Sequence, residues 1–202
     1  MICVIDYGMG NLRSVSKALE KLGGEVVVSA SPADLEKSEK IVLPGVGAFG
    51  DGSHELQKRG LFEPLKKALL CKKKFLGICL GMQLLFEESE ESPGAKGLGI
   101  FQGKVQRFRN PSVKIPHMGW NEMKMNRPEA RIFKGLQGDS YFYFVHSYYP
   151  VPKDTQLVLG MCEYGGETFA AFIGGDPIYG SQFHPEKSQE AGLQILHNFV
   201  VL

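Results

Sequence analysis

The chain has 202 residues, of which 43% are hydrophobic and 22% are charged, as in most soluble globular proteins. Its 23 Lys and Arg residues nearly balance its 22 Asp and Glu residues, which argues against nucleic acid as a partner. No apolar run approaches the roughly 18 residues that cross a bilayer, and the N-terminus resembles a core strand rather than a signal peptide. We expect no membrane association and a single domain over residues 1–202.

Residues 1–90 alternate between short apolar runs and helical patterns. In Leu12–Leu22 the apolar residues recur every three or four positions, which predicts an amphipathic helix. The other expected elements are strands at Ile2–Asp6, Glu25–Ser29, Lys40–Leu43 (ended by Pro44) and Lys74–Ile78, and helices at Gly52–Leu70 and Leu80–Glu88. Nearly continuous apolar strands separated by helices predict an α/β fold, with an open, mostly parallel central sheet flanked by helices.

After about residue 97 the pattern changes to short strands separated by Gly and Pro, which predicts additional antiparallel strands in the second half. They are expected at Gly103–Phe108, Met118–Met125, Tyr141–Val145, Leu157–Glu163, Thr168–Ile173 and Ile178–Gln182, with a final helix at Gln189–Leu202. The stripe of Tyr141, Tyr143 and Val145 indicates sheet packing. The only tryptophan, Trp120, suits either the core or an interface.

The pentapeptide Gly77-Ile78-Cys79-Leu80-Gly81 follows an apolar run and precedes an amphipathic stretch. It has the G-x-nucleophile-x-G form of a strand-to-helix elbow, with cysteine in the place of serine. The helix expected after Cys79 would offer backbone N–H groups that stabilise a thiolate and an oxyanion. A lone G-x-C-x-G also occurs by chance, and a cysteine at a strand end is often a small buried hydrophobe.

His184-Pro185-Glu186, after the last expected strand, supplies the partners that such a cysteine needs. Proline forces the preceding residue into the extended region, where side chains two apart point to the same side, so Glu186 can orient His184. By itself, His184 would more simply be a surface histidine beside a turn proline. Beside an elbow cysteine, a Cys79–His184–Glu186 triad is the better interpretation.

Pro44-Gly45-Val46-Gly47 lies at the end of the third expected strand, where ligand crevices form in open parallel sheets. Its glycines allow backbone N–H groups to turn toward a bound oxygen, so the loop can pair with the Leu80 N–H as an oxyanion hole. An ordinary turn between a strand and a helix explains this segment equally well.

The remaining cysteines and histidines indicate neither a disulfide framework nor a metal site. The four cysteines are scattered without a C-x-x-C pair, which suits a reducing cytoplasm. His117 and His146 lack metal-ligand spacing, and His54 and His197 lie in helical patterns as expected surface residues.

Six segments are compared with known families: three contain the candidate catalytic and oxyanion residues, and three lie elsewhere in the chain. The first three are Pro44–Gly47, Gly77–Gln83 and His184–Ser188, and the others are Tyr7–Asn11, Pro116–Asn121 and Phe144–Tyr148. Together, over residues 1–202, they resemble the class I (triad) glutamine amidotransferases. The PGVG loop and the PHMGWN segment are similar to those of the glutaminase (HisH) subunits of imidazole glycerol phosphate synthase.

The resemblance implies a glutaminase that needs no cofactor or metal. Cys79 would attack the side-chain carboxamide of glutamine and form a thioester, while His184 moves the proton and Glu186 orients it. The resemblance also implies oxyanion and glutamine-binding positions at Gly45, Val46, Gly47, Leu80, Gln83, His146, Ser147 and Tyr148.

The same resemblance implies a heterodimer with a (β/α)₈ cyclase subunit, which uses the ammonia to form imidazole glycerol phosphate in histidine biosynthesis. Asn11, Met118, Trp120 and Lys187 match family positions at or near that interface. Cytoplasmic localisation is expected.

Two other functions fit parts of the sequence. A triad enzyme could send its ammonia to pyridoxal phosphate or aminodeoxychorismate synthesis, although Pro116–Trp120 and the lack of a fused synthase domain argue against this. A non-catalytic scaffold would have no chemical reason to keep Cys79, His184 and Glu186 together.

Overall fold

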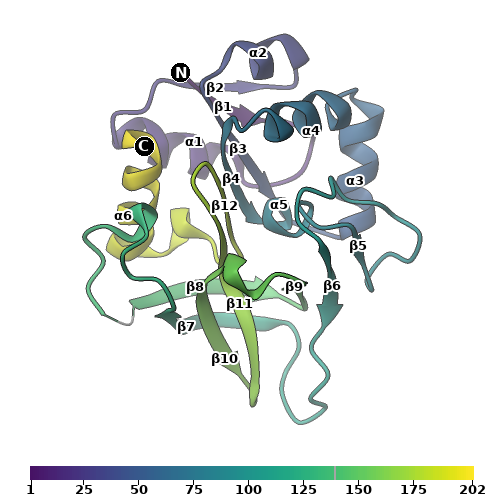
Figure 1. Cartoon of the computed structure of the whole chain (residues 1–202), viewed down its shortest axis with the longest axis vertical. Coiled ribbons are helices and arrows are strands. Elements are labelled where there is room, and N and C mark those ends of the chain that lie inside the picture. Colours follow the sequence, from purple (N-terminus) through teal and green to yellow (C-terminus); the bar gives the residue numbers. More distant parts are fainter. Residues whose placement is uncertain (139) are drawn as a thin grey trace.

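A twisted sheet of nine strands runs through the molecule in the computed structural model, which describes residues 1–138 and 140–202 (Figure 1). The strand order is β2-β1-β3-β4-β12-β11-β10-β7-β8. The parallel strands are β1 (Ile2–Ile5), β2 (Val26–Ser29), β3 (Lys40–Gly45), β4 (Lys74–Cys79) and β12 (Ile178–Ser181). The antiparallel strands are β11 (Glu167–Gly175), β10 (Val158–Tyr164), β7 (His117–Met125) and β8 (Ser140–His146).

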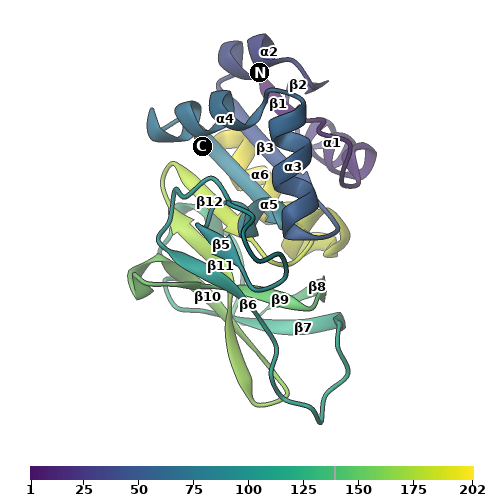
Figure 2. The ribbon, with the colours of Figure 1, turned by 90° about the vertical axis from the view of Figure 1, so that its right-hand side faces the viewer.

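Helices cover both faces of the parallel half (Figures 1 and 2). One side carries α1 (Leu12–Lys21) and α6 (Gln189–Val201), and the other carries α2 (Pro32–Lys37), α3 (Phe49–Lys58) and α4 (Phe62–Leu70). Alternate strand residues serve the two cores: Val42 packs with the first set and Ile41 with the second. The predicted α/β fold is confirmed. None of the helices in the described residues has the length and apolar character that crossing a bilayer requires.

A smaller sheet extends the second half of the chain beside the carboxyl ends of the parallel strands. It contains β5 (Glu88–Ser89), β6 (Gly103–Arg107) and β9 (Tyr148–Pro152), and β9 continues almost directly from β8. Short 3₁₀ turns complete the chain: η1 (Arg131–Phe133), η2 (Thr155–Leu157) and η3 (Pro185–Lys187). The sequence pattern predicted neither β5 nor β9.

The helix predicted over Leu80–Glu88 is wrong: α5 spans only Leu80–Gln83. The carbonyls that would continue it are taken by the segment that follows, since Leu98 N–H donates to Leu84 and Ile100 N–H to Leu85. Tertiary hydrogen bonds therefore replace the next turn of helix.

Two boundaries near Pro44 and Gly60 also differ from the prediction. Pro44 does not end β3, which continues to Gly45; the pairing of β3 with β1 ends at Val42, so that ladder does not need the missing N–H of Pro44. The predicted helix Gly52–Leu70 is two helices, because Gly60 lies at φ +67° between α3 and α4.

The predicted packing stripe of Tyr141, Tyr143 and Val145 on β8 lies outside the core. Phe142, Phe144 and His146 point into the core, whereas Tyr141 is 58% exposed on the other face. The register pairs Tyr143 with Trp120 across β7, so the predicted packing stripe lies on an open face of the sheet.

Candidate active site

Cys79 ends β4 in the strained conformation of a nucleophile elbow, at φ 53° and ψ −106°. Both flanking glycines are required by contact. A Cβ on Gly77 would lie 2.5 Å from the Gly81 carbonyl oxygen, and one on Gly81 would lie 1.8 Å from the carbonyl oxygen of Leu43. The steric reason for the G-x-C-x-G spacing is therefore present on both sides of the cysteine.

Replacing Gly81 with alanine is expected to destabilise the chain by about 3 kcal/mol or more, because β3 must move to admit the methyl group. Urea unfolding measures the change. Gly175→Ala is the matched control, since a Cβ there meets nothing within 4 Å, and it should change stability by no more than about 0.5 kcal/mol. Equal stability of the two variants would contradict the steric account.

His184 and Glu186 form a buried pair just after β12, the strand next to β4. His184 Nδ1 lies 3.0 Å from Glu186 Oε1, and the two side chains are 3% and 1% exposed. The backbone holds this segment, because the His184 N–H donates to Tyr143 and the His184 carbonyl accepts from the Ser188 hydroxyl. The predicted proximity of His184 and Glu186 is thus present, but its predicted basis is wrong: His184 is extended at φ −97° and ψ 98°, whereas Glu186 lies in the 3₁₀ turn η3 and not in extended chain.

The second ring nitrogen of His184, Nε2, is the one available to the Cys79 thiol. Nε2 is buried and makes no hydrogen bond of standard geometry among the described residues, as is common in catalytic sites without substrate. Burial acts to lower the pKa of His184, but the interactions with Cys79 and Glu186 outweigh it and raise the pKa to about 10. The environment favours an imidazolium beside the cysteine sulfur.

The loop Gly45–Gly47 crosses above Cys79, and Gly45 is opposite Cys79 in the β3–β4 register. A Cβ on Gly45 would lie 2.1 Å from the Tyr7 hydroxyl and 2.9 Å from Cβ of Leu80, so only glycine fits. Gly47 lies at φ +101°, a conformation that favours glycine. Gly45 thus lies opposite Cys79, and Val46, Gly47 and Leu80 line the same pocket as Cys79.

The Tyr7 hydroxyl behind this loop is completely buried and has no hydrogen-bond partner among the described residues. A buried unpaired hydroxyl costs stability, so Tyr7→Phe is expected to raise the free energy of unfolding by about 1 kcal/mol. Thermal or urea unfolding checks this. A loss of stability would instead indicate a partner that the hydroxyl finds in solution.

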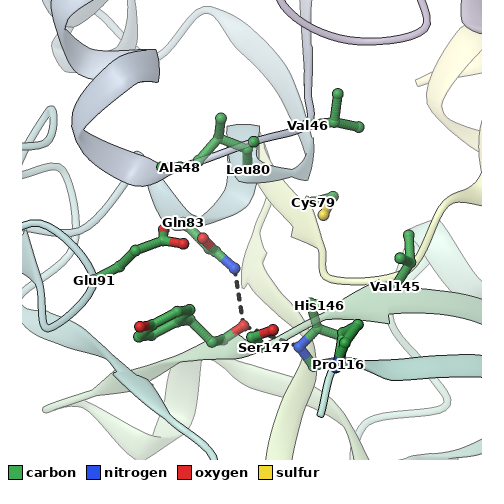
Figure 3. A pocket seen from close by; sticks show the side chains of 12 residues that line it. Val46, Ala48, Cys79, Leu80, Gln83, Glu91, Pro116, Val145, His146 and Ser147 are labelled. Carbon is green, nitrogen blue, oxygen red and sulfur yellow. Dashed lines mark hydrogen bonds between the residues drawn. The ribbon is translucent and has the colours of Figure 1, made fainter.

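A cavity of about 410 Å³ opens in front of Cys79, large enough for an amino acid side chain (Figure 3). Its walls are Val46, Gly47, Ala48, Cys79, Leu80, Gln83, Glu91, Pro116, Val145, His146, Ser147 and Tyr148. Every predicted oxyanion or glutamine-binding residue except Gly45 lines it. The Gln83 amide nitrogen donates to the Tyr148 carbonyl at 2.9 Å, which leaves the amide oxygen of Gln83 free for a ligand.

His146 supports the cavity wall rather than offering a free nitrogen to a ligand. Its Nδ1 lies 2.9 Å from the Tyr148 carbonyl, and its Nε2 lies 3.1 Å from Nδ1 of His117. Burial lowers the pKa of His146 to about 3 and that of His117 to about 4, so both rings are neutral at pH 7. The sequence did not predict this pairing, although both histidines stood out.

Met118, Trp120, Tyr143 and Lys187 lie together on the open face of β7 and β8, here called the outer face. Met118 is 61% and Trp120 47% exposed, and Trp120 packs edge-on against Tyr143 with the ring centres 6.3 Å apart. The Lys187 amine lies 5.7 Å from the centre of the Tyr143 ring. Asn11 is exposed at the start of α1, where its side chain accepts from the Ser14 N–H.

Comparison with known proteins decides the family. The family model of class-I glutamine amidotransferases matches residues 3–202. The chain belongs to the class-I glutamine amidotransferases. A relative from Synechococcus elongatus, called imidazole glycerol phosphate synthase subunit HisH, is 49% identical over 98% of this chain and 92% of its own length. The subunit of the same name from Syntrophotalea carbinolica is 49% identical over 98% of both chains.

Solved structures agree on the amidotransferase fold. The PurLQS structure from Thermotoga maritima matches with a TM-score of 0.79 at 21% identity, over 99% of this chain and 97% of its own. A crystal structure of a glutamine amidotransferase matches with a TM-score of 0.74 at 19% identity, over the full length of both chains.

Two polar side chains of this amidotransferase site escaped sequence reasoning. Gln182 is completely buried, with its Nε2 3.6 Å from the Cys79 sulfur, and Glu91 accepts the Phe49 N–H at the start of α3 at 2.8 Å. Gln182 ends the predicted strand Ile178–Gln182, two residues before His184, so the same expected alternation that favoured Glu186 could have indicated it. Glu91 is brought in by a long loop, which no local pattern predicts.

Proposed function

We propose that this chain is the glutaminase subunit of an imidazole glycerol phosphate synthase and supplies ammonia to a cyclase subunit. The observation that carries the proposal is the placement of Cys79 and the His184–Glu186 pair at neighbouring strand ends, beside a glutamine-sized cavity. The 49% identity to HisH subunits supports the choice among amidotransferases, and the name of those relatives implies a synthase of more than one subunit.

Hydrolysis begins when the Cys79 sulfur, as thiolate, attacks the side-chain carbonyl carbon of glutamine. His184, as imidazolium, already carries the proton that came from the thiol and passes it to the leaving nitrogen, so that ammonia departs and a thioester remains. Water then adds to the thioester carbonyl with His184 as base, and release of glutamate restores the thiol. Glu186 holds the imidazole in the orientation that presents Nε2 to the sulfur.

Backbone N–H groups of Leu80 and of the Gly45–Gly47 loop stabilise the oxyanion in both steps. Such donors act strongly in a site sealed from water. Because α5 is only four residues long, the amide of Leu80 matters here more than a helix dipole. Gln83, Ser147 and Tyr148 line the part of the cavity where the rest of the glutamine would be held.

The outer face is the proposed docking surface for the cyclase, a (β/α)₈ barrel. Its exposed methionine and tryptophan, with a half-buried tyrosine beside one lysine, have the composition of an interface centre. A sealed connection is needed because ammonia that reaches water becomes ammonium and loses its nucleophilic lone pair. Asn11 is also assigned to this interface; it precedes α1, which contacts η3, the turn that carries Lys187. A cytoplasmic site of action is part of the proposal.

The test measures glutamate release by the chain alone and with a cyclase subunit and its ligand. We expect slow hydrolysis by the chain alone and a stimulation of at least about 100-fold in the complex. Trp120→Ala should weaken cyclase binding at least about tenfold, whereas Leu70→Ala, which removes an exposed apolar side chain on α4, should not. Full activity without the cyclase, or equal binding by both variants, would contradict the proposal.

A further inference from the structure

We propose that Gln182 is a further catalytic residue, whose side-chain N–H donates a hydrogen bond to the Cys79 sulfur and stabilises the thiolate. The inference rests on the proposed role of Cys79 as nucleophile. Gln182 directly follows β12, and the Gln182 side chain is completely buried. Its Nε2 lies 3.6 Å from Sγ of Cys79, within the range of an N–H to sulfur hydrogen bond.

The hydrogen-bond network fixes which end of the Gln182 amide faces the sulfur. The Tyr148 carbonyl can only accept, so the Gln83 atom 2.9 Å from it must be the amide nitrogen. The same Gln83 nitrogen lies 3.2 Å from the Gln182 side chain, which must therefore present its oxygen. The other end of the Gln182 amide, the N–H₂ group, is then directed at Cys79.

A second chain of hydrogen bonds, which starts on β7, ends on the same Tyr148 carbonyl. Asn121 accepts the Glu122 N–H with its side-chain oxygen, so its nitrogen donates to the Glu163 carbonyl and to Nε2 of His117. Neutral His117 then donates from Nδ1 to His146, and His146 donates from Nδ1 to the Tyr148 carbonyl. The Tyr148 carbonyl thus accepts from both His146 and Gln83, which agrees with the orientation of the Gln83 and Gln182 amides given above.

The chemistry of the sulfur makes this donor useful. An N–H donor stabilises an anionic sulfur more than a neutral thiol or thioester. Gln182 therefore supports the charge when the thiol proton moves to His184, and again when the sulfur leaves as thiolate on hydrolysis of the thioester. Because Gln182 is buried, water cannot replace the donor once it is removed.

The test is the pH dependence of Cys79 alkylation by iodoacetamide in the full chain, followed by mass spectrometry of the Cys79 peptide. The exposed Cys71 serves as the internal reference. Gln182→Met keeps the length of the side chain without the donor. We expect the midpoint of alkylation to move up by about one pH unit, with about tenfold slower alkylation at pH 7 and slower cyclase-stimulated glutamine hydrolysis.

The matched control is Asn198→Leu, which removes another buried amide, one that donates to the Ile132 and Lys134 carbonyls. It should lower stability without moving the alkylation midpoint. An unchanged midpoint in Gln182→Met, or an equal shift in Asn198→Leu, would overturn the inference. Failure of the proposed function is seen separately, as glutamine hydrolysis that persists in Cys79→Ala.

If Gln182→Met does not fold, a measurement on the unsubstituted chain can test the same hydrogen bond. In protein labelled with ¹⁵N at glutamine side chains, one amide signal should titrate with the midpoint of Cys79 alkylation. That titration should disappear in Cys79→Ala. No titrating glutamine amide would refute the hydrogen bond to the sulfur.

Discussion

Cys79→Ala is expected to reduce glutamine hydrolysis by the cyclase complex by at least about 10⁴-fold, because among the described residues no other thiol lines the cavity. Cys79 is the cysteine that lines the cavity, whereas Cys3 and Cys162 are buried in the cores. Burial raises the pKa of Cys3 to about 11 and that of Cys162 to about 12, which keeps both as thiols. Glutamate release measures the effect.

Ammonium salts provide the control for Cys79→Ala. The variant complex should form imidazole glycerol phosphate from added ammonium at the rate of the unsubstituted complex, since the cyclase is untouched. Cys71→Ala, at an exposed thiol, should retain full glutamine-dependent activity. Failure of ammonium to rescue the Cys79→Ala complex would refute the role of this chain as ammonia donor.

Sequence reasoning found the parts of the site that depend on local geometry. The elbow is partly local: the steric demand on Gly77 arises from Gly81 within the same turn, whereas that on Gly81 comes from Leu43 of β3. The His184–Glu186 contact is local too, since His184 immediately precedes the short turn η3, which Pro185 begins and which carries Glu186. Short-range constraints of this kind leave a pattern in the chain itself.

Features that depend on distant segments could not be predicted in the same way. The helix after Cys79 stops at Gln83 because the segment around Leu98 takes its carbonyls. The hydrogen bond from Gln182 to Cys79 exists because β12 inserts beside β4, after about a hundred intervening residues. Local propensity contains no information on either event.

The burial of the Phe142 and Phe144 face of β8, rather than the Tyr141 and Tyr143 face, could not be predicted for a different reason. Both faces of this strand are aromatic, so the alternation fixes two faces without saying which one is buried. The phenylalanines Phe142 and Phe144 are more apolar than Tyr141 and Tyr143, and they occupy the core. The tyrosines instead lie on the same side of the sheet as Trp120. This exposed aromatic surface, which the sequence did not predict, is the surface where the partner is proposed to dock.

His184→Gln is expected to lower cyclase-stimulated glutamine hydrolysis on the order of 10³-fold, because an amide can occupy the site beside Glu186 but cannot transfer a proton. It should also change the pH dependence of stability. The pKa of His184 is raised from 6.5 to about 10 in the folded chain, so folding favours the protonated ring. The protonated His184 ring therefore contributes its full stabilisation of the folded state below about pH 6.5, and this stabilisation is lost as the pH rises toward 10.

The free energy of unfolding in urea, measured from pH 6 to 10, therefore distinguishes His184→Gln from its control variant. The unsubstituted chain should lose stability over this range, and His184→Gln should lose markedly less. The matched control is His197→Gln, which replaces an exposed histidine on α6 and should keep both the activity and the pH dependence of the unsubstituted chain. If His184→Gln kept the same decline in stability, the imidazolium would not be the resting state of the site, and proton transfer would have to begin from neutral His184.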